Sequence, residues 1–148
     1  MRKYLNFLII ISASFFLISC APIIESVKVV LGTSTKALED ARITAIAKTY
    51  KCGIDDCYDA VVAMARVDGL GRVINKEGYF NIFQQDPIDG IIVVMGVEGS
   101  VDTTEVGIFF TILDNRDIHI EVTSLSSSAK RKVAQYIFTE LNTRFNEV

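Results

Sequence analysis

Cys52 and Cys57 are the two residues whose spacing most directly suggests chemistry. Four residues separate them, and two such thiols can join in a disulfide when a protein resides in an oxidising compartment. The bridge would close a short loop, which stabilises a fold by roughly 2 kcal/mol in the chain-entropy treatment. The alternative is a pair of reduced cysteines that act as small apolar side chains. A redox-active site is disfavoured, because such sites use a Cys-x-x-Cys spacing.

A second candidate lies at Ser127 and Lys130, which have the Ser-x-x-Lys spacing of a nucleophile motif in penicillin-binding proteins and class A β-lactamases. The companion Ser-Asp-Asn and Lys-Thr-Gly motifs are absent, so we interpret the serines as the N-terminal cap of a helix. At the same helix start, Lys130 and Arg131 with the hydroxyls of Ser127 and Ser128 could bind an anion such as a phosphate or a lipid headgroup. The alternative, which the sequence favours, is a solvated run of charges.

Other catalytic or metal-binding groups are sparse. His119 is the only histidine, and the alternating pattern places it on the solvent-facing side of a strand, without a nucleophile or an orienting group. A zinc site needs three or four Cys, His or carboxylate ligands, which this sequence does not supply. The acidic segments 86–89 and 114–117 lack the loop length and closing Glu of a calcium site, and turn formation explains them. We therefore expect no metal, no cofactor and no catalytic residue.

The first residues have the features of a secretory signal peptide. Arg2 and Lys3 precede an apolar run over residues 7–18, and small residues follow. The run is shorter than the roughly 18 residues that span a bilayer, which disfavours a retained transmembrane helix. The Leu-x-Ser-Cys ending at residues 17–20 resembles the lipobox of bacterial lipoproteins, in which the cysteine is acylated and becomes the new N-terminus. The resemblance implies that residues 1–19 are removed and that Cys20 carries acyl chains such as palmitate.

By the same resemblance, the mature protein is a lipoprotein attached to a membrane of the cell envelope. Ala21 follows the anchor, whereas Asp at this place retains lipoproteins in the inner membrane of enteric bacteria, so we expect the outer membrane and the periplasm. The leader holds two of the fifteen basic residues and none of the eighteen acidic ones, so its removal changes the formal net charge from −3 to −5. This acidity argues against binding of nucleic acid, and leaves the acyl chains as the membrane anchor.

Removal of residues 1–19 from the 148-residue chain leaves 129, which suffice for one domain with a hydrophobic core. We expect residues 20–42 to form a lipidated tether with a helical turn over 36–42, and residues 43–148 to form the globular domain. The apolar pattern predicts strands over 43–51, 79–84, 91–97, 104–113 and 118–122. It predicts one helix capped by Asp55 that ends near residue 68 or residue 76, and a second helix over 129–146.

The predicted order is therefore β-α-β-β-β-β-α. Short turns between consecutive strands indicate an antiparallel sheet of about five strands, and the fold class is α+β. Both helices should cover one face of this sheet. The strand over 104–113 alternates well, with Val106, Ile108, Phe110 and Ile112 on one side.

This order resembles the helix-grip or TBP-like domains of small envelope lipoproteins, including the BamC component of the outer-membrane assembly machinery. The segments that carry the resemblance mark the ends of elements and cover residues 48–52, 57–61, 78–79, 86–92 and 126–138. It implies a fold and a location in the envelope, but a fold does not by itself define a function.

Two functions follow from the sequence. The first is a non-enzymatic module that docks on an envelope protein through a sheet edge or the groove beside the C-terminal helix. The alternative is a carrier or sensor that holds a small amphipathic ligand between the sheet and that helix. A large apolar pocket would favour the carrier, and a filled core with an exposed apolar patch would favour the interaction module.

Overall fold

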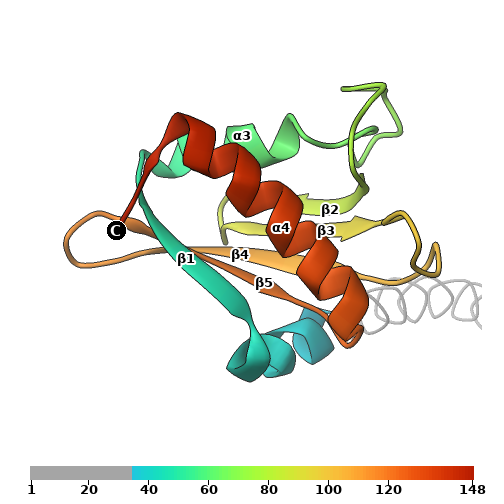
Figure 1. Cartoon of the computed structure of the whole chain (residues 1–148), viewed down its shortest axis with the longest axis horizontal. Helices are drawn as coiled ribbons and strands as arrows, with labels where there is room; N and C mark the ends of the chain where they lie inside the picture. Colours follow the sequence, from blue (N-terminus) through green and yellow to red (C-terminus); the bar gives the residue numbers. More distant parts are fainter. Residues whose placement is uncertain (1–34) are drawn as a thin grey trace, which may run out of the picture. The chain divides into compact units, whose positions relative to one another are not determined.

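A six-stranded antiparallel sheet organises residues 35–148, the part of the chain that the computed structural model describes. The strands lie in the order β2-β3-β4-β5-β1-β6 (Figure 1). Their bounds are β1 Ile46–Lys51, β2 Asn81–Asp86, β3 Ile91–Met95, β4 Val106–Ile112, β5 Ile118–Thr123 and β6 Asn146–Glu147. Helix α3 (Ile54–Val62) follows β1, and helix α4 (Ser127–Arg144) follows β5. The predicted α+β class and element order are confirmed, and the two-residue β6 adds a sixth strand.

The main hydrophobic core lies between the sheet and the helices α3 and α4, which cover the same face (Figure 1). Side chains that alternate along the central strands point into it, as the pleat of a strand requires. Ile108 and Ile120 are fully buried, and they belong to one cluster with Val133, Ile137 and Leu141 of α4. No side chain in this set has any exposed surface, so apolar residues fill the space beneath α4.

The opposite face of the sheet is covered at one end by a helical segment at residues 35–40 and the 3₁₀ helix η1 (Ala41–Thr44). Leu38 is 3% exposed and packs against Val93 and Phe109. The guanidinium of Arg42 lies 4.8 Å from the centre of the Phe109 ring. The folded unit thus begins at Ala37, earlier than the predicted boundary at residue 43, because these side chains cover apolar surface of β3 and β4.

The first strand and the first helix differ at their ends from the prediction. Strand β1 starts at Ile46, because the Ala45 N–H donates to the Arg42 carbonyl (2.9 Å) and closes the 3₁₀ turn before it. Helix α3 is capped by Gly53, and Asp55 lies in its first turn instead of capping it. It ends at Val62, shorter than either predicted version, because the chain beyond it pairs with the sheet edge.

The second strand is shifted towards the C-terminus relative to the predicted range 79–84. Tyr79 lies outside it and stacks on Tyr136 of α4, with ring centres 4.2 Å apart. A change of register between Ile82 and Gln84 leaves Phe83 as an extra residue in β2. Such a bulge breaks the two-residue alternation on which the prediction rested.

Strand β4 keeps the predicted alternation over most of its length. Val106, Ile108 and Phe110 are buried, as predicted for their face. Ile112 is 60% exposed, because it stands at the end of the strand beyond the core.

Candidate functional site

Residues 63–80 connect α3 to the edge strand β2 and pair with its beginning. The Arg66 N–H donates to the Phe80 carbonyl (2.7 Å), and the Ile82 N–H donates to the Val67 carbonyl (3.0 Å). Gly78 allows this approach, since a Cβ atom there would lie 2.4 Å from the Arg66 nitrogen. The backbone of Arg66 is therefore fixed at the end of the sheet.

A buried carboxylate holds the turn that follows. The Asp68 side chain accepts from the backbone N–H groups of Leu70 (2.9 Å) and Arg72 (2.8 Å), and from Nε of Arg72 (2.7 Å). The backbone N–H of Arg72, aided by its side chain, holds the pKa of Asp68 below its usual range. The carboxylate of Asp68 therefore holds the turn at residues 68–72 in place.

A cleft of about 410 Å³ opens where this connection meets β2 and β3. Its lining combines charged, amide and apolar groups: Arg66, Asn81, Ile82, Phe83, Met95, Gly96 and Asp102. Nη2 of Arg66 donates to the carbonyl oxygens of Gly96 and Tyr79. Nε of Arg66 is buried and has no hydrogen-bond partner. The guanidinium forms no ion pair with any carboxylate among residues 35–148, although the carboxylate of Asp102 lines the same cleft.

Exposed apolar side chains lie on the same connection and on β2. They are Leu70 (80% exposed), Val73, Ile74, Tyr79 and Phe83, and we call these five residues the edge surface. In Figure 1 the connection projects beside β2, at the end of the sheet farthest from β6. Large exposed apolar side chains that occur together are typical of interaction sites in soluble domains.

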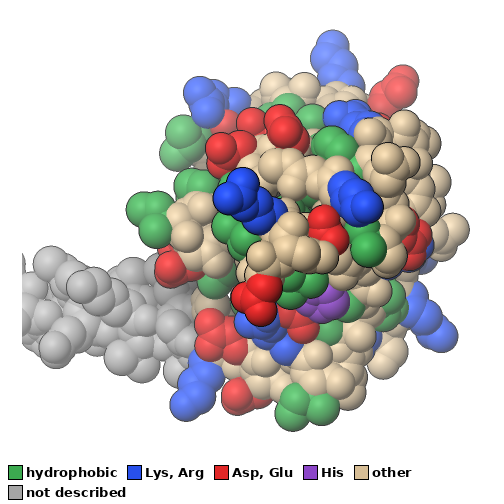
Figure 2. Space-filling view, turned by 90° about the vertical axis from the view of Figure 1, so that its left-hand side faces the viewer, with side chains coloured by type: hydrophobic (Ala, Val, Ile, Leu, Met, Phe, Trp, Pro, Cys, Tyr) green, Lys and Arg blue, Asp and Glu red, His purple; other side chains and the backbone are tan. Residues whose placement is uncertain are grey.

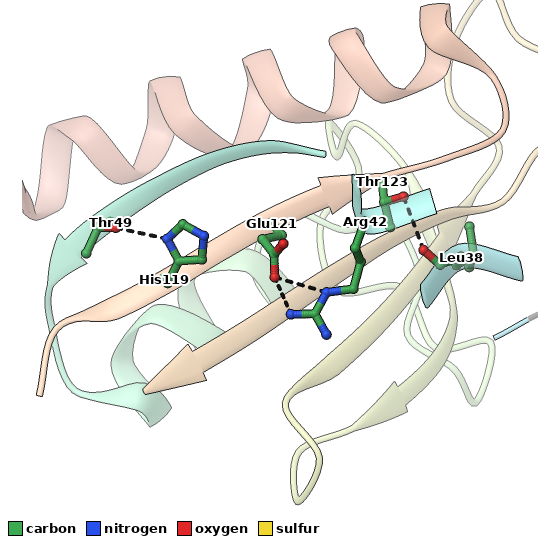
Figure 3. A network of polar contacts seen from close by, with 6 residues as sticks. All are labelled: Leu38, Arg42, Thr49, His119, Glu121 and Thr123. Atoms are coloured by element: carbon green, nitrogen blue, oxygen red, sulfur yellow. Dashed lines mark hydrogen bonds and ion pairs between the residues drawn. The ribbon is translucent and has the colours of Figure 1, made fainter. Parts of the chain in front are cut away.

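The sheet face opposite the main core carries a row of polar contacts (Figure 3). Thr49 of β1 and Nδ1 of His119 are hydrogen-bonded at 3.0 Å, and Arg42 forms an ion pair with Glu121. Thr123 donates to the carbonyl of Leu38 (3.2 Å). These contacts join η1 and β1 to β5. His119 is half-buried and bonded to a threonine, rather than fully facing solvent as predicted, and this arrangement contains no activated nucleophile.

Figure 2 shows the histidine at the surface among acidic and basic side chains that are interspersed. No extended area of one charge is visible on this face. The view therefore offers no charged surface that would attract a polyanion through long-range electrostatics.

The predicted disulfide is present in the structure. Cys52 and Cys57 are joined, with their Cα atoms 6.0 Å apart. Cys57 is fully buried in the first half of α3, and Cys52 follows the end of β1. The bridge therefore fixes the turn between β1 and α3. Cys20, the predicted lipidation site, lies outside the described residues.

Among the four residues of the predicted anion site, Lys130 bonds to a distant part of the chain. Ser126 caps α4 and accepts from the Ala129 N–H (3.4 Å), while its hydroxyl also contacts that of Ser128 (3.1 Å). Lys130 is buried, and its ammonium donates to the carbonyl and hydroxyl oxygens of Thr44 in η1. Ser127 and Arg131 are exposed. The serines thus cap the helix, as the sequence favoured, but Lys130 is buried against Thr44 rather than part of a solvated run of charges.

The acidic turns behave as their sequence suggested. The Asp86 carboxylate accepts from the N–H groups of Ile88 and Asp89, both at 3.1 Å. Within the described part of the chain, no three His, Cys, Asp or Glu side chains come close enough to hold a metal ion. No helix over residues 35–148 is long and apolar enough to cross a bilayer.

No family model, no curated protein and no solved structure matches the chain. No sequence pattern indicates the cleft, because Arg66 and Asp102 are brought together with Asn81 only by the tertiary fold. The aromatic Tyr79 and the glycine before it were the only sequence signal in this region.

Proposed function

We propose that this chain is a lipid-anchored, non-enzymatic interaction module that docks on a polypeptide of the cell envelope through its edge surface. Cys20 would be the acylated anchor, and the location would be the outer membrane facing the periplasm. The observation that carries the proposal is the set of exposed apolar side chains on the connection to β2. Burial of such side chains by a partner is favourable at about 25 cal/mol per Å² of apolar surface.

The position of the edge surface supports docking by a polypeptide. Strand β2 stands at the end of the sheet, and an edge strand is where another chain can approach. Residues 65–67 bond to the start of the edge strand at Phe80 and Ile82, and they also pair with residues 73–75 of the same connection. A partner could therefore contact both the apolar side chains and the remaining strand edge.

The alternative, a carrier with its ligand between the sheet and α4, has less support. Val133, Ile137 and Leu141 of α4 are fully buried against the sheet. The cleft around Arg66 lies at the edge of the sheet instead. A ligand beneath α4 would have to displace close-packed side chains, which is costly in a well-filled core.

Site-specific photo-crosslinking in the native host tests the proposal. A photoreactive residue is placed at Leu70 in the full, acylated chain, and the matched control is Leu125, which is equally exposed (80%) but precedes α4. We expect one defined partner to be crosslinked from position 70 and not from position 125. Crosslinking should disappear in Cys20→Ala, because the module no longer reaches the membrane. Equal crosslinking from both positions, or none from position 70, would contradict the proposal.

A further inference from the structure

We infer that the cleft around Arg66 binds the C-terminal carboxylate of a polypeptide whose last residue is apolar. This inference rests on the proposed function and specifies which part of the partner is recognised. Four features of the cleft support the inference: its hydrogen-bond donors, its open space, its acceptor and its apolar wall.

The donors come from Arg66 and Asn81. Nη2 of Arg66 donates to the carbonyls of Gly96 and Tyr79, which orients the guanidinium and leaves Nη1 to donate to a ligand, and no described carboxylate forms an ion pair with it. The side-chain amide of Asn81 has no hydrogen-bond partner among the described residues. A guanidinium paired with a neutral amide donor suits a carboxylate, because charge-assisted hydrogen bonds are the stronger ones.

The space between these donors exists because residue 96 is a glycine. A Cβ atom on Gly96 would lie 2.8 Å from Nδ2 of Asn81 and 4.0 Å from Nη2 of Arg66. Gly96 also has a φ of +66°, a conformation that glycine adopts at no steric cost. A side chain at residue 96 would therefore crowd the Asn81 amide and the Arg66 guanidinium, and glycine keeps this side of the cleft open to a ligand.

The acceptor and the apolar wall distinguish a peptide terminus from other carboxylates. Asp102 lines the same cleft, is exposed and is not paired with Arg66. Its charge repels any carboxylate, but it can accept the backbone N–H of a terminal residue, a donor that a fatty acid lacks. Phe83 and Met95 supply an apolar wall for the terminal side chain. The volume of about 410 Å³ accommodates one or two residues of a chain end.

Fluorescence polarisation with the full chain in detergent micelles tests the inference without any variant. The probes are fluorescein-Gly-Ala-Ala-Phe with a free C-terminal carboxylate, the same peptide as a C-terminal amide, and fluorescein-labelled dodecanoic acid with a free carboxylate. We expect the free acid to bind at least about tenfold more tightly than the amide, as loss of a charge-assisted bond implies. Equal binding of acid and amide would overturn the inference. Preferential binding of the fatty acid would also overturn it.

Variants then locate the site. Asn81→Asp changes no volume and places a negative charge beside the carboxylate, so it should weaken binding of the acid by about tenfold or more. Arg66→Gln should do the same, and Arg131→Gln, an exposed arginine on α4, should leave binding unchanged. Thermal unfolding of each variant checks that it remains folded. If Asn81→Asp is folded and binds the acid like the parent protein, the cleft is not the site.

The two proposals fail separately. Crosslinking from Leu70 together with equal binding of acid and amide would leave the docking module intact and remove the carboxylate site. Acid-specific binding without any crosslinked partner would keep the carboxylate site and remove the docking module.

Discussion

Lys130 donates from its ammonium to both the carbonyl and the hydroxyl oxygen of Thr44, across 86 residues of sequence. The contact ties the first turn of α4 to the last residue of η1, which directly precedes β1. Lys130 is 9% exposed, so its charge is largely removed from water. A buried ammonium of this kind needs its hydrogen bonds, because an unsatisfied charged donor is costly.

Lys130→Ala is therefore expected to lower the free energy of unfolding by about 1–3 kcal/mol, through lost hydrogen bonds and lost packing of the aliphatic stem. Urea denaturation followed by circular dichroism measures the change. Arg131→Ala is the matched control, since it removes an exposed charge from the next position and should change stability by less than about 0.5 kcal/mol. Equal effects of the two substitutions would show that the Thr44 contact contributes nothing.

The disulfide gives a second prediction. In the double variant Cys52→Ala/Cys57→Ala, the free energy of unfolding should fall by roughly 2 kcal/mol, because the short loop is no longer closed in the unfolded chain. A reductant should lower the melting temperature of the parent protein and leave that of the double variant unchanged. A reductant effect of the same size in both proteins would contradict the prediction.

The ion pair between Arg42 and Glu121 gives a third prediction. Both side chains are partly buried, and the Arg42 guanidinium also lies over the Phe109 ring. A double-mutant cycle with Arg42→Ala and Glu121→Ala should yield a coupling of about 0.5–1 kcal/mol that weakens as salt is added. The exposed pair Glu140 and Arg144 on α4 provides the control cycle, with an expected coupling of about 0.3–0.5 kcal/mol.

A larger coupling at Glu140 and Arg144 than at Arg42 and Glu121 would contradict this ranking. The reason for the ranking is burial, since the Glu121 side chain is 15% exposed and the Glu140 side chain is 35% exposed. Screening by solvent and salt is weaker for the more buried pair.

Local sequence patterns were sufficient to predict much of this fold. Strand β4 and helix α4 follow from apolar periodicity that the core preserves, as at Ile108 and Ile137, and strand β3 follows from a continuous apolar run that includes Ile92. The disulfide was one of two alternatives that the sequence left open for Cys52 and Cys57, and the structure decides between them. These features depend on residues that are close in the chain or on one face of an element.

The remaining features depend on partners distant in sequence. The bulge at Phe83 follows from the pairing of β2 with β3, and no residue type in the strand predicts it. Lys130 looked like part of an anion site, because its sequence neighbours are polar and Thr44 is far away in the chain. Arg66, Asn81 and Asp102 come from three separate segments and line one cleft only after folding. Pattern analysis cannot assemble such a site without the tertiary structure.

The two buried tyrosines predict how stability depends on alkaline pH. Burial, and secondarily the charge of Glu147, raises the pKa of Tyr50 to about 12. Burial, with the charges of Asp86 and Asp59, likewise raises the pKa of Tyr58 to about 12. In the unfolded chain a tyrosine ionises near pH 10. Below that pH both states hold the proton and stability is unaffected.

Between about pH 10 and pH 12 only the unfolded state loses these protons, so the free energy of unfolding must fall as the pH rises. Urea denaturation at pH 8, 9, 10 and 11 should therefore show a steep decline in the parent protein. Tyr50→Phe keeps the ring and loses the hydroxyl bond to Asn142 (2.8 Å), so it is less stable at pH 8, but its decline should be shallower. Lysine ionisation affects both proteins equally and cancels in the comparison. Parallel curves for the two proteins would mean that Tyr50 ionises at its ordinary pKa in the folded state.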